Sequence, residues 1–118
     1  MIKGIHSIVY TKDAEKLREF FKDVLELPYI DTGGGWLIFA LPPAEIAAHP
    51  TEGKPFHELY FMCDDINSTL DKLKAKGVKV VQEVTDQGWG LLATIMIPGG
   101  DEFGIYQPKH PMAINLKK

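Results

Sequence analysis

The sequence predicts an α+β fold in which two βαβββ units form one curled, mixed β-sheet cup. The order of strand, helix and three strands occurs twice along the 118 residues. A single unit of this kind has one helix and a half-exposed sheet, so it cannot bury its apolar face alone. We therefore expect one domain, 1–118, with a helix on each outer side of the sheet. Its parts are unit one (1–50), a linker (51–55), unit two (56–108) and a polar, loosely held tail (109–118).

The first unit begins with a β-rich, alternating segment, which predicts a strand over 5–11. Asp13 is placed to cap a helix of about three turns with one apolar face, and Pro28 ends this helix. Three further strands are expected near 29–30, over 36–41 and over 44–49, separated by glycine and proline residues.

The second unit repeats this order. A strand over 56–63 leads to Asp65, which is placed to cap a second helix that ends at Gly77. Strands then follow over 78–84, 91–97 and 103–107.

The repeat is visible when the units are aligned. Residues 6–13 align with 58–65, and both segments end in the aspartate that precedes the helix. Trp36 and Trp89 then stand at the start of equivalent strands. Identity between the units is low, so the repeated order of elements carries the prediction.

Composition excludes several classes of partner. Net charge is −3 and acidic and basic residues are interspersed, so nucleic acid is not an expected partner. No apolar run approaches the roughly 20 residues of a membrane span, so no membrane partner is expected. Cys63 is the single cysteine, which predicts a cytoplasmic location for the protein. We expect the Cys63 side chain to be a small buried hydrophobic group rather than a nucleophile.

Two short strings resemble the vicinal-oxygen-chelate superfamily of glyoxalases, extradiol dioxygenases and bleomycin-resistance proteins. Its units open with a strand of the form His-x-x-x-x-x-x-Asp that runs into a helix, as residues 6–13 do. Its second unit often closes with a glycine-containing turn, a strand and Gln-Pro, as residues 98–108 do. The resemblance covers about residues 4–108 and implies the fold described above.

The resemblance also implies a divalent metal, held by residues of the first and last strands of each unit. His6, Glu58 and Glu45 occupy such positions, and imidazole and carboxylate ligands suit Mn, Fe, Ni or Zn. At Glu45 another alignment puts Ile46 in the ligand position, so this register stays open. The last strand departs from the pattern, because Gly104 stands where a carboxylate is expected and the ligand set is incomplete. A pocket or surface role is the alternative for each of these residues.

Three functions remain open. The first is a metal-dependent lyase or dioxygenase of the glyoxalase or extradiol type. The second is a metal-free protein of the bleomycin-resistance type that binds a small aromatic or cationic molecule in the cup. The third is a structural or regulatory domain with no ligand. The expected pocket residues are Tyr10, Tyr60, Met62 and Tyr106, with core or rim packing as the alternative. The resemblance further implies a homodimer, which in some members forms by exchange of units.

Overall fold

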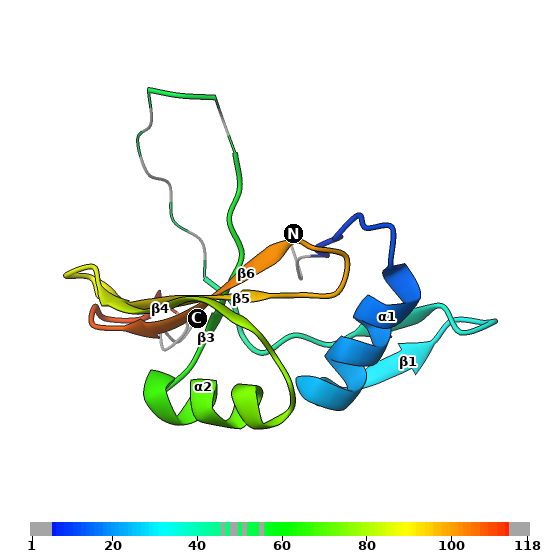
Figure 1. Cartoon of the computed structure of the whole chain (residues 1–118). Coiled ribbons are helices and arrows are strands. Elements are labelled where there is room, and N and C mark those ends of the chain that lie inside the picture. The colour runs from blue at the N-terminus through cyan, green and yellow to red at the C-terminus, as the bar shows by residue number, and fades with distance from the viewer. Residues whose placement is uncertain (1–5, 46, 48–49, 51, 55, 114–118) are drawn as a thin grey trace.

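The computed structural model describes residues 6–45, 47, 50, 52–54 and 56–113, and it forms two β-sheets and two helical segments (Figure 1). The elements in chain order are α1 (Ala14–Glu19), the π-helical turn η1 (Phe20–Val24), β1 (Tyr29–Asp31), β2 (Leu37–Phe39), β3 (Tyr60–Met62), α2 (Ile66–Ala75), β4 (Val80–Asp86), β5 (Gly90–Met96) and β6 (Glu102–Pro108). This is the α+β architecture that the sequence predicts. None of the described helices is long and apolar enough to cross a membrane.

The second unit has the complete βαβββ order. Its four strands lie in the order β3-β6-β5-β4, with β3 parallel to β6 and the other pairs antiparallel. The helix α2 connects the parallel strand β3 to the antiparallel part of the sheet. The strands predicted over 78–84, 91–97 and 103–107 are confirmed with small shifts of their ends, while the strand predicted over 56–63 is shortened to β3.

Local sequence explains why α2 forms between these strands. The Asp65 side chain accepts a hydrogen bond from the backbone N–H of Ser68 at 3.1 Å, which confirms the predicted N-cap. Ile66, Leu70 and Leu73 lie on one face and are buried against the sheet. Gly77 follows the helix with φ of 86°, the left-handed conformation typical of a helix end.

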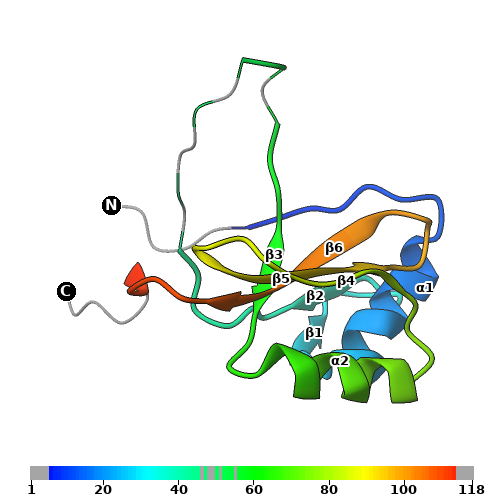
Figure 2. The same ribbon diagram turned by 60° about the vertical axis from the view of Figure 1, so that its left-hand side comes forward.

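The core lies between the helices and one face of the four-stranded sheet. Its buried residues come from α1, η1, α2, β5, β6 and the residue that follows β5, and are Leu17, Phe20, Ile66, Leu70, Leu73, Ala93, Ile95, Ile97, Phe103 and Ile105. Both helical segments therefore share this one core and lie on the same side of the sheet, as the second view shows (Figure 2). The expectation of one helix on each outer side of the sheet is wrong for this structure.

The first unit is less complete than the sequence predicts. Residues 6–11 do not form a strand, because they have no backbone partner in either sheet. Residues 44, 45 and 47 are not in a strand either, and the remainder of the strand predicted over 44–49 lies outside the described residues. What forms is the helical segment and an antiparallel pair in which β1 meets β2.

The start of α1 also differs from the prediction. The Asp13 side chain makes no capping hydrogen bond, although Asp13 occupies the N-cap position. Its own backbone N–H instead donates to the Thr11 hydroxyl oxygen at 3.2 Å. At the other end, the ring of Phe21 packs edge-on against Phe39 of β2 and stacks on Phe103 of β6, with centroid distances of 5.3 and 6.2 Å. Aromatic packing thus joins the first unit to the second.

We expect Gln107→Ala to destabilise the fold through α2. The Gln107 side-chain oxygen accepts a hydrogen bond from the backbone N–H of Ile66 at 2.8 Å, which satisfies a donor that the helix itself cannot pair. Its loss should lower the free energy of unfolding by about 1–2 kcal/mol. Urea unfolding checks this against Gln82→Ala, an exposed glutamine on β4. Equal stability of the two variants would contradict this role of Gln107.

Candidate functional site: an aromatic sheet face

The face of the four-stranded sheet that points away from the helices carries the candidate site. Side chains alternate along a strand, so residues between the core positions of β5 and β6 point to this second face. Tyr60 pairs in register with Gly104, and Met62 with Tyr106. Because paired residues lie on the same side of a sheet, Tyr60, Met62 and Tyr106 share this face. Three of the four expected pocket residues are therefore brought together.

Gly104 lies beneath the ring of Tyr60. A Cβ atom placed on Gly104 would overlap the Cδ1 and Cε1 atoms of the Tyr60 ring, and Gly104 is itself buried. The parallel pairing of β3 with β6 holds the ring in this place. A side chain at position 104 would have to displace the ring, so the glycine and the tyrosine occupy this volume as a matched pair.

Tyr106 lies on a second glycine in the same way. A Cβ atom on Gly90 would overlap the Tyr106 ring. The ring of Trp89 packs edge-on against Tyr106 with a centroid distance of 5.2 Å, and the Tyr106 hydroxyl donates to the Trp89 carbonyl oxygen at 3.3 Å. Tyr60 lies on the other side of Tyr106 at 5.9 Å. We call Tyr60, Trp89 and Tyr106 the aromatic cluster. Tyr106 is its buried centre, and Trp89 remains 41% exposed.

Glu45 lies close enough to the aromatic cluster to affect it electrostatically. Burial raises the pKa of the Tyr106 hydroxyl above its ordinary value, and the negative charge of Glu45 raises it further. Glu45 is half-buried, and its Oε2 accepts a hydrogen bond from the backbone N–H of Ala113 at 2.7 Å. A segment of the first unit thus meets the C-terminal tail beside the cluster.

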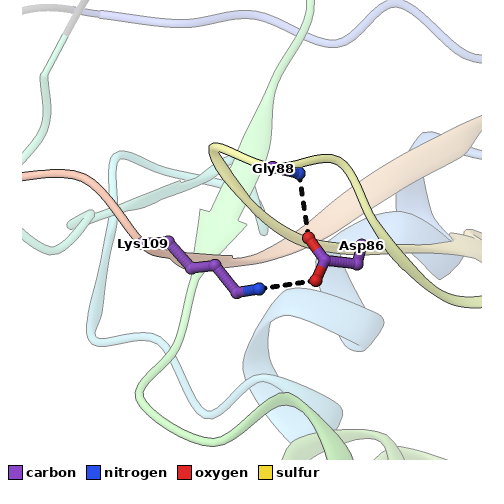
Figure 3. Close-up of polar contacts among 3 residues, drawn as sticks. All are labelled: Asp86, Gly88 and Lys109. Carbon is purple, nitrogen blue, oxygen red and sulfur yellow. Dashed lines mark hydrogen bonds and ion pairs between the residues drawn. The ribbon is translucent and has the colours of Figure 1, made fainter.

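The start of the tail contacts the sheet through Lys109 and His110, whereas the sequence predicts a loosely held tail. Lys109 bonds the carboxylate of Asp86 with its ammonium at 2.6 Å, and its backbone N–H donates to the Trp89 carbonyl oxygen at 3.0 Å. Asp86 also accepts from the backbone N–H of Gly88, as Figure 3 shows. The hydrogen bond from Lys109 lowers the pKa of this exposed carboxyl, and the one from Gly88 adds to the effect. The ring of His110 then lies 5.8 Å from Tyr106.

The three expected metal ligands lie in three separate segments of the described chain. His6 is exposed in the segment without strand pairing, and Glu58 is exposed just before β3. Glu45 bonds the tail backbone. Within the described part of the chain, no group of three or more His, Cys, Asp and Glu side chains could hold a metal ion. Position 104, where a carboxylate ligand was expected, does not fit one because the Tyr60 ring fills the space. The metal role of His6, Glu45 and Glu58 stays a prediction.

Two other expectations have different outcomes. Tyr10 is 89% exposed and lies on the opening segment, which has no strand pairing. Sequence reasoning placed Trp89 only at the start of a strand and missed that it forms the exposed edge of the aromatic cluster. The available signal was the next residue, Gly90, which pairs with Pro108 of β6. Glycine in a strand often marks the close approach of another group, here the Tyr106 ring.

Cys63 fits the predicted role of a small hydrophobe. It is partly buried and packs against the core. Burial raises the pKa of its thiol above the ordinary value, which keeps the sulfur protonated and weakly nucleophilic. It is therefore not a candidate for covalent chemistry.

The fold and this face together define a class of protein, an α+β domain whose second unit has the βαβββ order and carries an aromatic sheet face. The sequence profile described as Glyoxalase/Bleomycin resistance protein/Dioxygenase superfamily matches residues 4–107. The chain therefore belongs to this superfamily, as the resemblance predicted.

Solved structures share the fold at low sequence identity. TnmS3, an antibiotic binding protein from Streptomyces sp. CB03234, is 23% identical with a TM-score of 0.64 over 92% of this chain and 100% of its own. A superfamily member from Sphaerobacter thermophilus DSM 20745 is 18% identical, with a TM-score of 0.64 over 90% and 98% of the two chains. Lactoylglutathione lyase from Agrobacterium tumefaciens is 15% identical, with a TM-score of 0.60 over 89% and 96%. No curated protein sequence matches the chain.

We expect Gly104→Ala to destabilise the protein through the Tyr60 ring. The added methyl group would overlap the ring, and overpacking of this kind costs about 1–3 kcal/mol. In a Tyr60→Ala background the same substitution should cost less, because the obstructing ring is gone. The free energies of unfolding of the wild type, both single variants and the double variant measure this coupling. Additive effects of the two substitutions would show that the ring does not hold the place described.

Proposed function

We propose that this protein binds a small molecule on the aromatic face of its sheet without a resident metal. The observation that carries the proposal is the Tyr60 ring on Gly104, at the position where the family resemblance led us to expect a metal-binding carboxylate. Aromatic surface thus takes the place of a ligand atom. A cytoplasmic location, expected from the single cysteine, accompanies the proposal as a further prediction.

Aromatic contact suits binding better than it suits metal chemistry. A divalent metal needs several nitrogen or oxygen ligands that converge on one point. The aromatic cluster offers ring faces and edges, which attract flat apolar and aromatic molecules through dispersion and quadrupole interactions. Met62 shares this face, and a thioether adapts its shape to such ligands.

The chain's own residues have separate parts in the proposed binding. Tyr106 is the buried support, and its hydroxyl is fixed by the Trp89 carbonyl oxygen. Trp89 and Tyr60, which flank it, present the accessible rings. Lys109 ties the tail to the β4–β5 turn through Asp86 and so keeps the Trp89 backbone in place. No bond of the ligand needs to be broken, so the protein would sequester its ligand. The antibiotic binding named for TnmS3 is consistent with such a role.

We expect acridine, a flat three-ring probe, to bind this face and to quench Trp89. Trp36→Phe variants isolate the Trp89 signal, because these are the two tryptophans of the chain. Removal of one accessible ring in Tyr60→Ala should weaken binding about tenfold. Tyr29→Ala is the matched control, since Tyr29 lies on β1 against Phe39. Protein treated with a chelator should bind acridine as well as untreated protein does.

The same protein preparation tests the metal-dependent alternative. Protein purified without a histidine tag is analysed for bound metal, and its melting temperature is followed in added Mn²⁺, Ni²⁺ and Zn²⁺. We expect no stoichiometric metal and no shift of the melting temperature. A stoichiometric metal that is lost in His6→Ala, or acridine binding that requires a metal, would overturn the metal-free proposal.

We further propose that two copies associate through the first unit. Its opening segment is β-rich yet unpaired, and β1 and β2 form an isolated two-stranded sheet, which is marginally stable by itself. Large apolar side chains of this unit are exposed: Ile8 60%, Tyr10 89%, Ile30 64% and Trp36 62%. Exposed large apolar side chains in such number are typical of an interface. β3 is also an edge strand among the described residues, and an edge strand can pair with a strand of another chain.

We expect a particle of twice the 13.2 kDa chain mass in size-exclusion chromatography with light scattering. Tyr10→Asp and Trp36→Asp should shift it towards the monomer, because each places a charge in the proposed interface. Val81→Asp is the control, since Val81 is 41% exposed on β4 at the opposite edge of the sheet from β3. A monomeric wild type, or equal weakening by Val81→Asp, would contradict the proposed interface.

A further inference from the structure

The helix side of the sheet carries a cavity that the aromatic cluster does not use. We propose that this cavity binds a molecule with a short apolar chain and a carboxylate, and that the ammonium of Lys76 holds the carboxylate. The cavity is lined in part by residues of the core, whereas the aromatic cluster lies on the other face of the sheet. The inference is therefore independent of the proposed function.

The cavity opens where the two helical segments end. It has a volume of about 280 Å³ and is lined by residues of η1, by residues 76–79 between α2 and β4, and by residues 96–98 at the end of β5. Phe20 and Ile97 close it towards the core, since they are 6% and 2% exposed. Val24 and Val78 add partly buried apolar surface. The volume is close to the lower end of the range for ligand pockets, about 300–1,000 Å³, so it suits a short chain.

The local backbone keeps this space open. η1 is a π-helical turn over Phe20–Val24, and such turns occur frequently at functional sites. Gly77 follows α2 with φ of 86°, and a Cβ atom placed on it would meet no other atom within 4 Å. The glycine ends the helix without a side chain that could fill the space. Residues of both units thus form a shared apolar lining.

Lys76 connects the ends of the two helical segments, which lie side by side in both views (Figures 1 and 2). Its ammonium donates to the Val24 carbonyl oxygen at 3.0 Å and lies 3.6 Å from the Glu26 carboxylate. The Glu26 side chain is 78% exposed, so solvent screens this ion pair. An ammonium has three donors, and within the described chain that of Lys76 makes this one hydrogen bond. Its other donors can bind a carboxylate.

The charges around the cavity favour an anion. Lys79 is exposed, contributes to the lining and forms no ion pair with a described residue. Glu26 is the described carboxylate that pairs with Lys76, and it is left with two ammonium groups to compensate. The carbonyl oxygens of residues 72–74 already accept from the backbone N–H groups of residues 76–78, so the end of α2 needs no cation. A carboxylate on an apolar chain matches both the lining and the charge.

A series of straight-chain carboxylates tests the inference on the full-length protein. Binding of butanoate, hexanoate, octanoate and decanoate is followed by the NMR shifts of the backbone amides of residues 76–79. We expect the affinity to rise about three- to fourfold for each added methylene group until the cavity is full, and to stay constant beyond that length. Octanol should bind more weakly than octanoate, and octyltrimethylammonium more weakly still.

Lys76→Met keeps an apolar side chain and removes the ammonium. It should weaken octanoate binding about three- to fivefold and leave octanol binding unchanged. Lys74→Met is the matched control, because Lys74 also lies on α2 and its ammonium pairs with the exposed Glu83 at 3.2 Å. This control should change the binding of neither molecule.

Val78→Phe fills the cavity and should weaken octanoate and octanol alike, about tenfold or more. Urea unfolding establishes that the variant is folded, and Val24→Phe replaces it if it is not. Tyr60→Ala, on the opposite face, should leave octanoate binding unchanged. Absence of carboxylate binding, equal effects of Lys76→Met and Lys74→Met, or undiminished binding in the filled variant would overturn the inference, whereas acridine binding at the aromatic face would be unaffected.

Discussion

The pairing of β6 with a strand on each side is the constraint on which the rest of the structure depends. β6 lies between the parallel strand β3 and the antiparallel strand β5. On one face, Phe103 and Ile105 are buried against the helices. On the other, Gly104 and Tyr106 form the base of the aromatic cluster. A shift of one residue in this register would exchange the two faces of β6. The wrong side chains would then be buried, and the rings of the aromatic cluster would no longer lie together. Core and candidate site are thus specified by the same hydrogen bonds.

The exchange of a carboxylate for a ring changes the chemistry that this fold can support. The resemblance to the vicinal-oxygen-chelate superfamily implies that the last strand of the second unit supplies a metal ligand. Here Gly104 has no side chain, and Tyr60 from the neighbouring strand fills the volume. The glycine weakens a strand interior in general, but a large ring packed on it restores cross-strand contact. The site therefore gains apolar surface where it loses a donor atom, and the fold itself is retained, as the likeness to TnmS3 and to lactoylglutathione lyase indicates.

The second unit could be predicted from sequence because its signals are local. Asp65 and Gly77 delimit α2 by their own backbone chemistry, and alternation defines β5 and β6. The alternation also placed Tyr60 and Met62 on one face of their strand, and the register of β3 with β6 adds Tyr106 to that face. Asp13 has the same position before its helix as Asp65, yet only Asp65 caps, so the aligned position alone was insufficient.

The remaining features depend on contacts between distant residues, which no local pattern contains. The strand predicted over 5–11 needs a partner strand, and the described chain provides none for residues 6–11. Trp89 directly precedes β5, so the direction of its side chain could not be obtained from the alternation along that strand. Glu45 bonds the backbone of Ala113, which lies 68 residues later in the sequence. Ring surface supplies contact area with little preference among flat ligands. The pairing of β3 with β6, which brings Tyr60 and Met62 beside Gly104 and Tyr106, therefore decides that this face presents rings.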